Sequence, residues 1–251
     1  MNVSKEALDR MAEMIAESDR IVFFTGAGIS VPSGIPDFRS ANGIYQEKLH
    51  REYSPEEMVS HSFLFAHPEE FFSFYREKMV YPEAVPNRAH KFIAAVEKAG
   101  KHVTVVTQNI DGLHETAGSK RVIELHGSVH RNYCARCGKR YGLSSVLNGG
   151  AVPKCGCGGM IRPDVVLYEE PLDERVTEDA VKAIRKADML IIVGTSLVVY
   201  PAASYVRFYS GSRLAIVNLS RTSADQYADL CIYEDCEIVA DELFSRLPYQ
   251  V

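Results

Sequence analysis

The sequence lacks three features, and each absence excludes a class of protein. It has no basic excess, since 28 Lys and Arg against 33 Asp and Glu leave a net charge of −5, whereas a dedicated nucleic-acid binder is usually basic. No apolar run approaches the roughly 18 residues of a membrane span. The N-terminal residues have neither the apolar stretch nor the small-residue cleavage site of a signal peptide. We therefore expect a cytoplasmic protein with no membrane partner and no direct nucleic-acid partner.

Short uncharged runs alternate with helical patterns along most of the chain. The strand-like runs cover residues 21–25, 103–107, 122–125, 165–168, 189–193 and 214–217, and the helical patterns cover residues 4–17, 87–99, 176–187 and 201–210. Apolar strands that alternate with helices are typical of a parallel sheet covered on both faces. The pattern therefore predicts an α/β fold, with a Rossmann-like parallel sheet and helices on both of its faces.

Two segments interrupt this alternation. Residues 40–83 are rich in aromatic side chains and show helical stretches but no clear strand, and residues 131–160 contain four of the six cysteines. A chain of 251 residues can form one substantial core and a small accessory module. We expect a Rossmann-like domain made of residues 1–39, 84–130 and 161–251. The helical insert 40–83 and the cysteine-containing module 131–160 would together form a small domain.

Four of the cysteines stand in two close pairs with a metal-binding spacing. Cys134 and Cys137 are followed, after seventeen residues, by Cys155 and Cys157, and glycines lie beside each pair. Two such pairs can meet around one tetrahedral ion, and four thiolates with no open position suit a structural zinc ion. Two disulfides or four free thiols are the alternatives, and disulfides are rare in the cytoplasm. The spacing therefore predicts a small zinc ribbon.

Polar motifs follow the predicted strands at the point where each strand ends. GAGIS follows the first strand, and QNIDGLH, HGS, GTS and NLS follow four others. The carboxyl ends of parallel strands lie at one edge of a sheet, where such folds bind cofactors. Gly26 and Gly28 lack side chains, so the backbone there can approach a phosphate closely. His126 ends a strand and is well placed as a general base near neutral pH. Cys231 and Cys236 are expected in the core or near the cofactor.

The order of these motifs resembles that of the sirtuins, the Sir2 family of NAD-dependent protein deacylases. The matching stretches are GAGIS to SGIPDFR (26–39), TQNIDGLH (107–114), ELHG (124–127), the four-cysteine cluster, GTSLVVYPA (194–202) and VNLS (217–220). The resemblance implies cleavage of the nicotinamide–ribose bond of NAD and transfer of the acyl group of a modified lysine to ADP-ribose. It implies a deacetylase that yields nicotinamide, O-acetyl-ADP-ribose and free lysine. Its partners would be acetyl-lysine-containing proteins, with NAD as co-substrate and one structural zinc ion.

The resemblance also implies roles for individual residues. His126 would be the base that activates a ribose hydroxyl, Asn109 would orient the ribose and a water, and Asp111 would bind the nicotinamide carboxamide. Phe38 would shield the reacting ribose carbon from water, and Arg39 would contact the phosphates. The other cofactor-binding positions that the family implies are Gly26, Ala27, Gly28, Gln108, Ile110, Gly194, Thr195, Ser196, Asn218 and Ser220.

An extended segment after the cysteine module matches the family's peptide site. In the family this segment pairs with the acyl-lysine peptide, which adds a strand to an exposed backbone edge. The corresponding contacts here would be Val166, Leu167 and Tyr168. The family usually shows Gly-Glu after the aromatic residue, whereas this chain has Glu169 and Glu170. The change puts the local backbone and the peptide preference in question.

The helical insert bears on the nature of the acyl group. Sirtuins that prefer succinyl- or malonyl-lysine carry a Tyr and, three residues later, an Arg, which pair with the acyl carboxylate. The matching positions in this chain are Phe72 and Tyr75. Without the arginine an acidic acyl group would be poorly compensated, so we expect acetyl or another neutral acyl group.

Three other functions use parts of the same pattern. A mono-ADP-ribosyltransferase cleaves the same bond, but it would leave ADP-ribose on protein and form no O-acetyl-ADP-ribose. A non-catalytic NAD-sensing module would not need Asn109, Asp111 and His126 together. A dehydrogenase would show GxGxxG with an acid about twenty residues later, whereas this chain shows GAG followed by IS. The deacetylase is therefore the main prediction.

Overall fold

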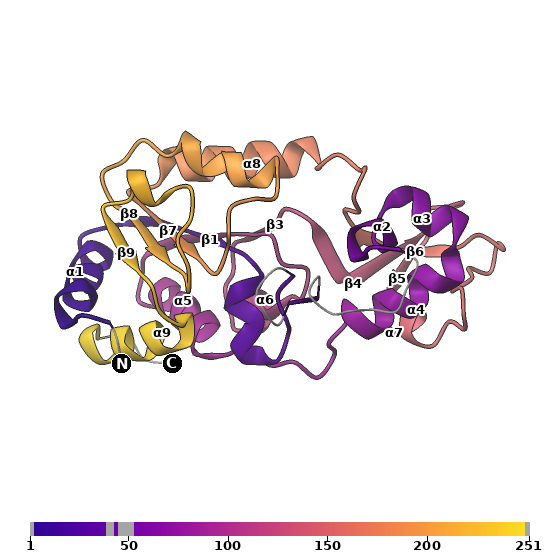
Figure 1. The fold of residues 1–251 in the computed structure, drawn as a ribbon, viewed down its shortest axis with the longest axis horizontal. Coiled ribbons are helices and arrows are strands. Elements are labelled where there is room, and N and C mark those ends of the chain that lie inside the picture. Colours follow the sequence, from indigo (N-terminus) through magenta and orange to yellow (C-terminus); the bar gives the residue numbers. More distant parts are fainter. Residues whose placement is uncertain (1–2, 39–42, 45–52, 249–251) are drawn as a thin grey trace.

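The computed structural model describes residues 3–38, 43–44 and 53–248, which form a large and a small lobe (Figure 1). The large lobe holds a six-stranded sheet and the small lobe a three-stranded sheet. Arg39, which the family resemblance places at the phosphates, lies outside the described residues. Within the described ranges, no helix combines the length and the apolar character needed to cross a membrane.

The large lobe is built on a parallel sheet with the strand order β3-β2-β1-β7-β8-β9. Its strands are β1 (Arg20–Thr25), β2 (His102–Thr107), β3 (Val122–Glu124), β7 (Met189–Val193), β8 (Leu214–Val217) and β9 (Leu230–Ile232). All neighbouring pairs run parallel. The strand order reverses between β1 and β7, and open α/β sheets bind ligands at such a switch point. The predicted Rossmann-like sheet is confirmed.

Helices cover both faces of this sheet, as the alternation of strands and helices predicts (Figure 1). Successive side chains of β1 point to opposite faces, so Phe23 packs in one apolar core and Phe24 in the other. The helices on the Phe23 face are α1 (Lys5–Ala16), α5 (Arg88–Lys98) and α9 (Cys236–Arg246). Those on the Phe24 face are α8 (Glu174–Lys186) and the 3₁₀ helix η3 (Ala202–Phe208).

The small lobe is organised around an antiparallel sheet with the order β5-β4-β6. Its strands are β4 (Gly127–Cys134), β5 (Arg140–Gly142) and β6 (Ile161–Val165). Its helices are α2 (Pro55–Met58), α3 (His61–Ala66), α4 (Pro68–Lys78) and α7 (Ser144–Leu147). The aromatic side chains of α3 and α4 fill the core between these helices and the sheet. This packing explains why the insert is so rich in aromatic residues.

One predicted strand is wrong, and some elements were missed or differ in type. The run 165–168 is not a strand of the parallel sheet, because β6 ends at Val165 and pairs with β4, and Tyr168 forms only a bridge to Ser60. An apolar run looks the same in sequence whether it is a central parallel strand or a buried segment of another sheet. The helix expected over 201–210 is a 3₁₀ helix, and β9 and α9 were not predicted.

The boundaries of the two domains stay a prediction. The small sheet takes β4 from residues on both sides of the boundary after residue 130, and it takes β6 from residues that the sequence assigns to the large domain. Chain segments therefore pass between the lobes within strands. As a result, the residues just before β4 and just after β6 lie at the junction of the two lobes.

Candidate active site

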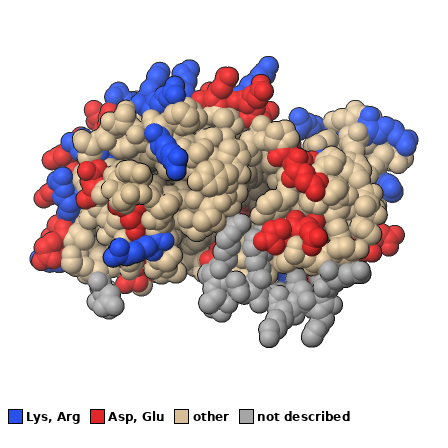
Figure 2. Space-filling model, turned by 45° about the horizontal axis from the view of Figure 1, so that its top comes forward, with Lys and Arg blue, Asp and Glu red and all other residues tan. Residues whose placement is uncertain are grey.

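The strand-end motifs converge on a cavity of about 260 Å³ at the carboxyl edge of the parallel sheet. The residues that line it from these motifs are Gly26, Ala27, Gly28, Gln108, Asn109, His126, Gly194, Thr195, Ser196, Asn218 and Ser220. Phe38 lines it as well. The prediction that the strand ends share one crevice is confirmed. The space-filling view shows a hollow between the two lobes, with mostly uncharged surface on its large-lobe side and acidic side chains on its small-lobe side (Figure 2).

The glycines of the first motif allow two backbone turns to touch. A Cβ on Gly28 would lie 2.8 Å from the Gly194 Cα, and a Cβ on Gly26 would lie 2.7 Å from the Thr195 Cβ. The N–H of Gly26 donates to Val193 O at 3.1 Å, and that of Gly28 donates to Gly194 O at 2.8 Å. These two N–H groups are therefore engaged within the protein. The Ala27 N–H, at the start of the 3₁₀ helix η1 (Ala27–Ser33), has no acceptor among the described residues.

Ser30 joins the two polar side chains that leave β2. The Asn109 amide nitrogen donates to Ser30 Oγ at 3.0 Å, and Ser30 Oγ donates to an Asp111 carboxylate oxygen at 2.7 Å. The other Asp111 oxygen accepts the N–H of Leu113 at 2.9 Å, at the start of the short helix α6 (Leu113–Thr116). The orientation of Asn109 and Asp111 is thus fixed by η1. Ser30 was missed in the sequence, although it is the last residue of the GAGIS motif.

A layer of buried polar side chains packs against the backbone that carries Asn109. Thr25 and Thr107 end the adjacent strands β1 and β2, and their hydroxyls lie 2.8 Å apart. The Thr107 hydroxyl accepts the N–H of Asn109 at 3.1 Å, and the Thr25 hydroxyl lies 3.0 Å from Nε2 of the fully buried His114. Burial holds the pKa of His114 well below its usual range. The layer is therefore neutral and rigid, which fixes the backbone that carries Asn109.

His126 lies where two cavities meet. Its Nδ1 is 2.8 Å from Gln108 O, and because a carbonyl can only accept, Nδ1 carries the proton in the neutral ring. Nε2 is then the basic atom, and it has no partner among the described residues. Burial lowers the pKa of His126, and the hydrogen bond to Gln108 O offsets only part of this effect. The ring is therefore a neutral base at physiological pH.

The second cavity, of about 270 Å³, extends from His126 into the small lobe. It shares Ala27, Phe38, Gln108, Asn109, His126 and Val199 with the first cavity. Beyond them its walls are largely apolar, and the side chains that form them include Ile35, Ile44, Val59, Ile110, Leu143, Val165 and Leu167. Such a cavity can receive an apolar group attached to a chain that enters from the surface.

The helical insert presents different residues to this cavity from those expected. Phe72 is fully buried and does not line it, whereas Tyr75 and, three residues later, Lys78 do. The Tyr75 hydroxyl is buried without a hydrogen-bond partner among the described residues, and burial raises its pKa. Lys78 Nζ lies 3.3 Å from a Glu77 carboxylate oxygen. Of the two positions matched in the sequence, Tyr75 therefore lines the cavity and Phe72 lies behind its wall.

The segment after β6 lines the same cavity. The N–H of Val166 donates to His126 O at 3.0 Å, while Val166 O accepts from no described residue. Leu167 is buried and Tyr168 is partly exposed. Glu170 turns back under the segment and accepts hydrogen bonds from the Arg162 guanidinium at 2.6 and 3.0 Å.

Glu170 stays ionised in this position. Burial would raise the pKa of its carboxyl, but the hydrogen bonds from Arg162 and from the Leu167 N–H outweigh that effect and lower the pKa to about 2. Removing one partner of such a buried pair would leave an uncompensated charge. The ion pair therefore fixes the course of the chain after β6.

The first cavity also includes two acidic residues that the sequence did not suggest. Glu234 and Asp235 line it together with Cys236, just after β9, the strand next to β8. Cys236 is buried and its thiol lies 3.8 Å from Gly28 O. The expectation of a thiol in the core or near the cofactor is thus confirmed for Cys236. The acidic pair could not be predicted because it follows β9, which has no clear pattern in the sequence.

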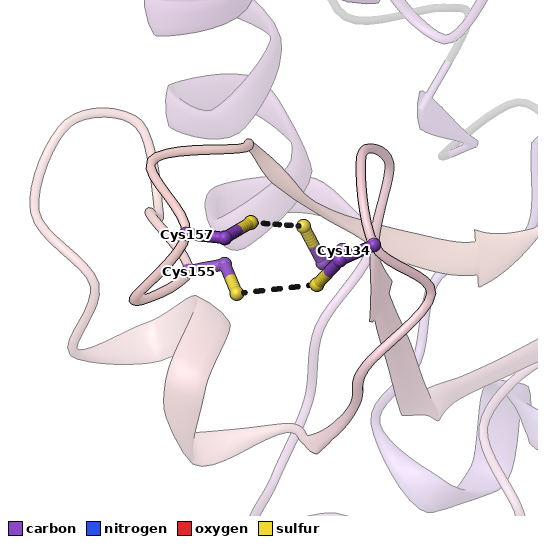
Figure 3. Close-up of side chains that lie close together, drawn as sticks. Cys134, Cys155 and Cys157 are labelled. Carbon is purple, nitrogen blue, oxygen red and sulfur yellow. Dashed lines mark hydrogen bonds between the residues drawn. The ribbon is translucent and has the colours of Figure 1, made fainter.

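The four paired cysteines form one cluster at the end of the small lobe (Figure 3). The Sγ atoms of Cys134 and Cys157 are 3.5 Å apart, those of Cys137 and Cys155 are 3.7 Å apart, and all four lie within 4.8 Å of one another. Four sulfurs around a tetrahedral zinc ion, at about 2.3 Å from it, are about 3.8 Å apart. The hydroxyl of Tyr141 donates to Cys155 Sγ at 3.0 Å. The cluster fits one closed zinc site.

Comparison with known proteins gives a consistent result. The model of the Sir2 family matches residues 26–201. The chain is 56% identical over 229 residues to the NAD-dependent protein deacetylase of Clostridium perfringens, with 90% of this chain and 94% of that protein covered. It is similar to a Sir2 structure with a deacetylated p53 peptide and 3′-O-acetyl ADP ribose (TM-score 0.89, 39% identity, 97% and 99% covered). It is also similar to a Sir2 structure bound to a propionylated peptide (TM-score 0.84, 38% identity, 95% and 98% covered).

Proposed function

The chain belongs to the Sir2 family, and we propose that it is an NAD-dependent protein-lysine deacetylase. It would transfer the acetyl group of a modified lysine to ADP-ribose and release nicotinamide and free lysine. The observation that carries the proposal is the position of His126 at the meeting point of two cavities. One cavity is bounded by the strand ends of a dinucleotide-binding sheet, and the other is apolar and reaches the surface of the small lobe.

His126 is proposed as the general base. Its Nδ1–H is held by Gln108 O, so Nε2 can take a proton from a ribose hydroxyl while the ring keeps its orientation. The ribose oxygen can then attack the acyl carbon, because the acyl-lysine would lie in the adjoining cavity. A base whose pKa is lowered by burial remains unprotonated over the whole neutral range.

The NAD side of the site is proposed to use the remaining strand-end residues. The free N–H of Ala27 can donate to a pyrophosphate oxygen, and Gly26 and Gly28 let the backbone approach. Asn109 and Asp111 would face the ribose and the nicotinamide carboxamide, with Ile110 beside them and Phe38 covering the ribose. Thr195, Ser196, Asn218 and Ser220 would line the ribose and adenine side, and Gln108 and Gly194 complete the wall of the cavity. Arg39 is proposed at the phosphates from the sequence alone.

The peptide side is proposed to use Val166, Leu167 and Tyr168. Within this segment the Val166 carbonyl accepts from no described residue, while the N–H and C=O groups of the other two are engaged. An acyl-lysine amide N–H entering the apolar cavity would find this carbonyl as its acceptor. Proteins that carry acyl-lysine are the proposed substrates, whereas a cytoplasmic location and the absence of nucleic-acid partners stay predictions from the sequence.

The proposal is tested by following all products of one reaction. Purified protein is incubated with an acetyl-lysine peptide, with and without NAD, and nicotinamide, free peptide and O-acetyl-ADP-ribose are quantified by mass spectrometry. The three products should appear in equal amounts and only with NAD. ADP-ribose attached to protein without O-acetyl-ADP-ribose would contradict the proposal in favour of a transferase, and NAD binding without turnover would favour a sensing module.

Acetyl-lysine is expected to be a better substrate than succinyl-lysine. The walls of the second cavity are largely apolar and its lysine, Lys78, already pairs with Glu77. Leaving a carboxylate poorly paired in such a cavity costs about 1 kcal/mol or more, so kcat/KM on succinyl-lysine should be at least about fivefold lower. Peptides of one sequence with acetyl-, propionyl- and succinyl-lysine are compared. A preference for succinyl-lysine that is lost in Lys78→Met would contradict the expectation.

A further inference from the structure

Glu169 has a backbone conformation that glutamate rarely adopts. Its φ angle is +75°, and only one other non-glycine residue in the described ranges, Leu197, has a positive φ. In this region a Cβ crowds the backbone, and glycine, which the family usually has here, avoids the cost. A residue stays in such a conformation only where its surroundings hold it, and such residues gather at binding sites.

The carboxylate of Glu169 keeps the residue in this conformation through hydrogen bonds. One oxygen accepts the backbone N–H of Ser62 at 2.9 Å, and the other accepts the Ser62 hydroxyl, also at 2.9 Å. Ser62 lies in the first turn of α3, where backbone N–H groups have no partner within the helix. Glu169 therefore caps α3 from a segment more than one hundred residues further along the chain.

Backbone contacts lie directly beside this bond. The N–H of Tyr168 donates to Val59 O at 3.1 Å, and the N–H of His61 donates to Tyr168 O at 3.0 Å. We call this junction between residues 59–62 and 168–170 the loop latch. The latch fixes the end of the segment 166–168, whose beginning is fixed by the hydrogen bond from Val166 to His126.

We propose that Glu169 is a positioning residue for the acyl-lysine peptide. Its carboxylate holds the loop latch closed, which keeps the segment 166–168 in the conformation that binds the peptide before the peptide arrives. A segment that is already ordered does not lose conformational freedom on binding. The inference rests on the proposed deacetylase function, and it gives the glutamate at this position a role that glycine cannot have.

The decisive variant is Glu169→Gly. Glycine accepts φ +75° without strain, so a residue that merely fitted this turn could be replaced with no loss. If the carboxylate positions the loop, the KM for the acetyl-lysine peptide should rise about fivefold, as expected for two lost hydrogen bonds at an exposed site. The kcat and the KM for NAD should change less than twofold. Affinity is measured in parallel by fluorescence anisotropy of a labelled acetyl-lysine peptide.

Three further variants separate the latch from other effects. Ser62→Ala should raise the peptide KM by a smaller factor, and the double variant should be no worse than Glu169→Gly, because both changes remove one interaction. Glu169→Gln should restore part of the affinity, since its amide oxygen can still accept the Ser62 N–H. Glu56 and Glu169 line the same surface groove, but Glu56 takes no part in the loop latch. Glu56→Gln therefore removes a negative charge beside the latch and should bind the peptide normally.

An unchanged or lower peptide KM in Glu169→Gly would overturn the proposal, and so would strictly additive effects of Glu169→Gly and Ser62→Ala. Thermal unfolding of each variant shows whether α3 remains folded. Wild-type protein that binds the peptide but releases no nicotinamide would count against the proposed function instead. The anisotropy titration would then still decide whether the latch holds the peptide-binding segment.

Discussion

The His126→Ala variant is expected to lose about 10²- to 10⁴-fold in kcat for deacetylation while remaining folded. The imidazole is held by one hydrogen bond to Gln108 O, and its Nε2 is the basic atom at the junction of the two cavities. Alanine leaves no base within reach of the ribose hydroxyl. The rate of free-lysine peptide formation at saturating NAD and peptide measures the effect.

The pH dependence and a matched variant complete this test. A base must be unprotonated, so activity falls as the pH drops through its pKa, and burial places the pKa of His126 below its usual value. The acid limb of kcat/KM in the wild type should therefore lie below about pH 6.5. His102→Ala changes an exposed histidine at the start of β2 and should leave the rate unchanged. Activity that survives in His126→Ala would show that another group is the base.

Loss of the zinc site is expected to unfold the small lobe and abolish peptide turnover. Cys134 and Cys155 are buried in the core of that lobe together with the aromatic side chains of α3 and α4. Structural zinc sites contribute on the order of 10 kcal/mol to the folding of small zinc-binding modules. Cys155→Ser should therefore reduce the zinc content from one ion per chain to none and expose the amides of β4 and β6 to hydrogen exchange.

The zinc prediction has a control within the same chain. Cys231 lies in β9, far from the cluster in sequence and in a different sheet, so Cys231→Ser should keep one zinc ion and full activity. The expected loss of turnover in Cys155→Ser follows from topology, because β4 begins directly after His126 and β6 leads directly into Val166. Retention of zinc and of amide protection in Cys155→Ser would contradict the assignment.

The parallel sheet could be predicted because the composition of its central strands is itself typical of buried strands. β1, β2 and β7 are buried on both faces, so apart from the first residue of β1 they are uncharged and mostly apolar runs that lead into polar motifs. β9 has only three residues, and its core position depends on pairing with β8 rather than on its composition. The run beginning at Val165 was wrongly predicted as a strand of this sheet. Its apolar side chains, including Val165 and Leu167, pack in the core of the small lobe instead.

The site was predictable where chemistry follows a strand end, and less so where it depends on packing. Asn109 and His126 stand in strand-end motifs, and the resemblance to the sirtuins implies a role for each. Ser30 is equally important to the geometry, yet a serine in a glycine-rich turn has no distinctive signal. The conformation of Glu169 depends on Ser62, which lies far away in the chain, so only the folded structure could show that a glutamate serves where glycine is usual.

His126 has a second property that follows from its backbone. Its side chain is anchored to the end of β2 through Gln108, while its own carbonyl accepts the N–H of Val166 at 3.0 Å. The group that would act on NAD and the segment that would receive the peptide are therefore one hydrogen bond apart, on opposite sides of one residue. If the two substrates bind as proposed, a displacement of the peptide segment that breaks this bond would act directly on the backbone of the residue that carries the imidazole.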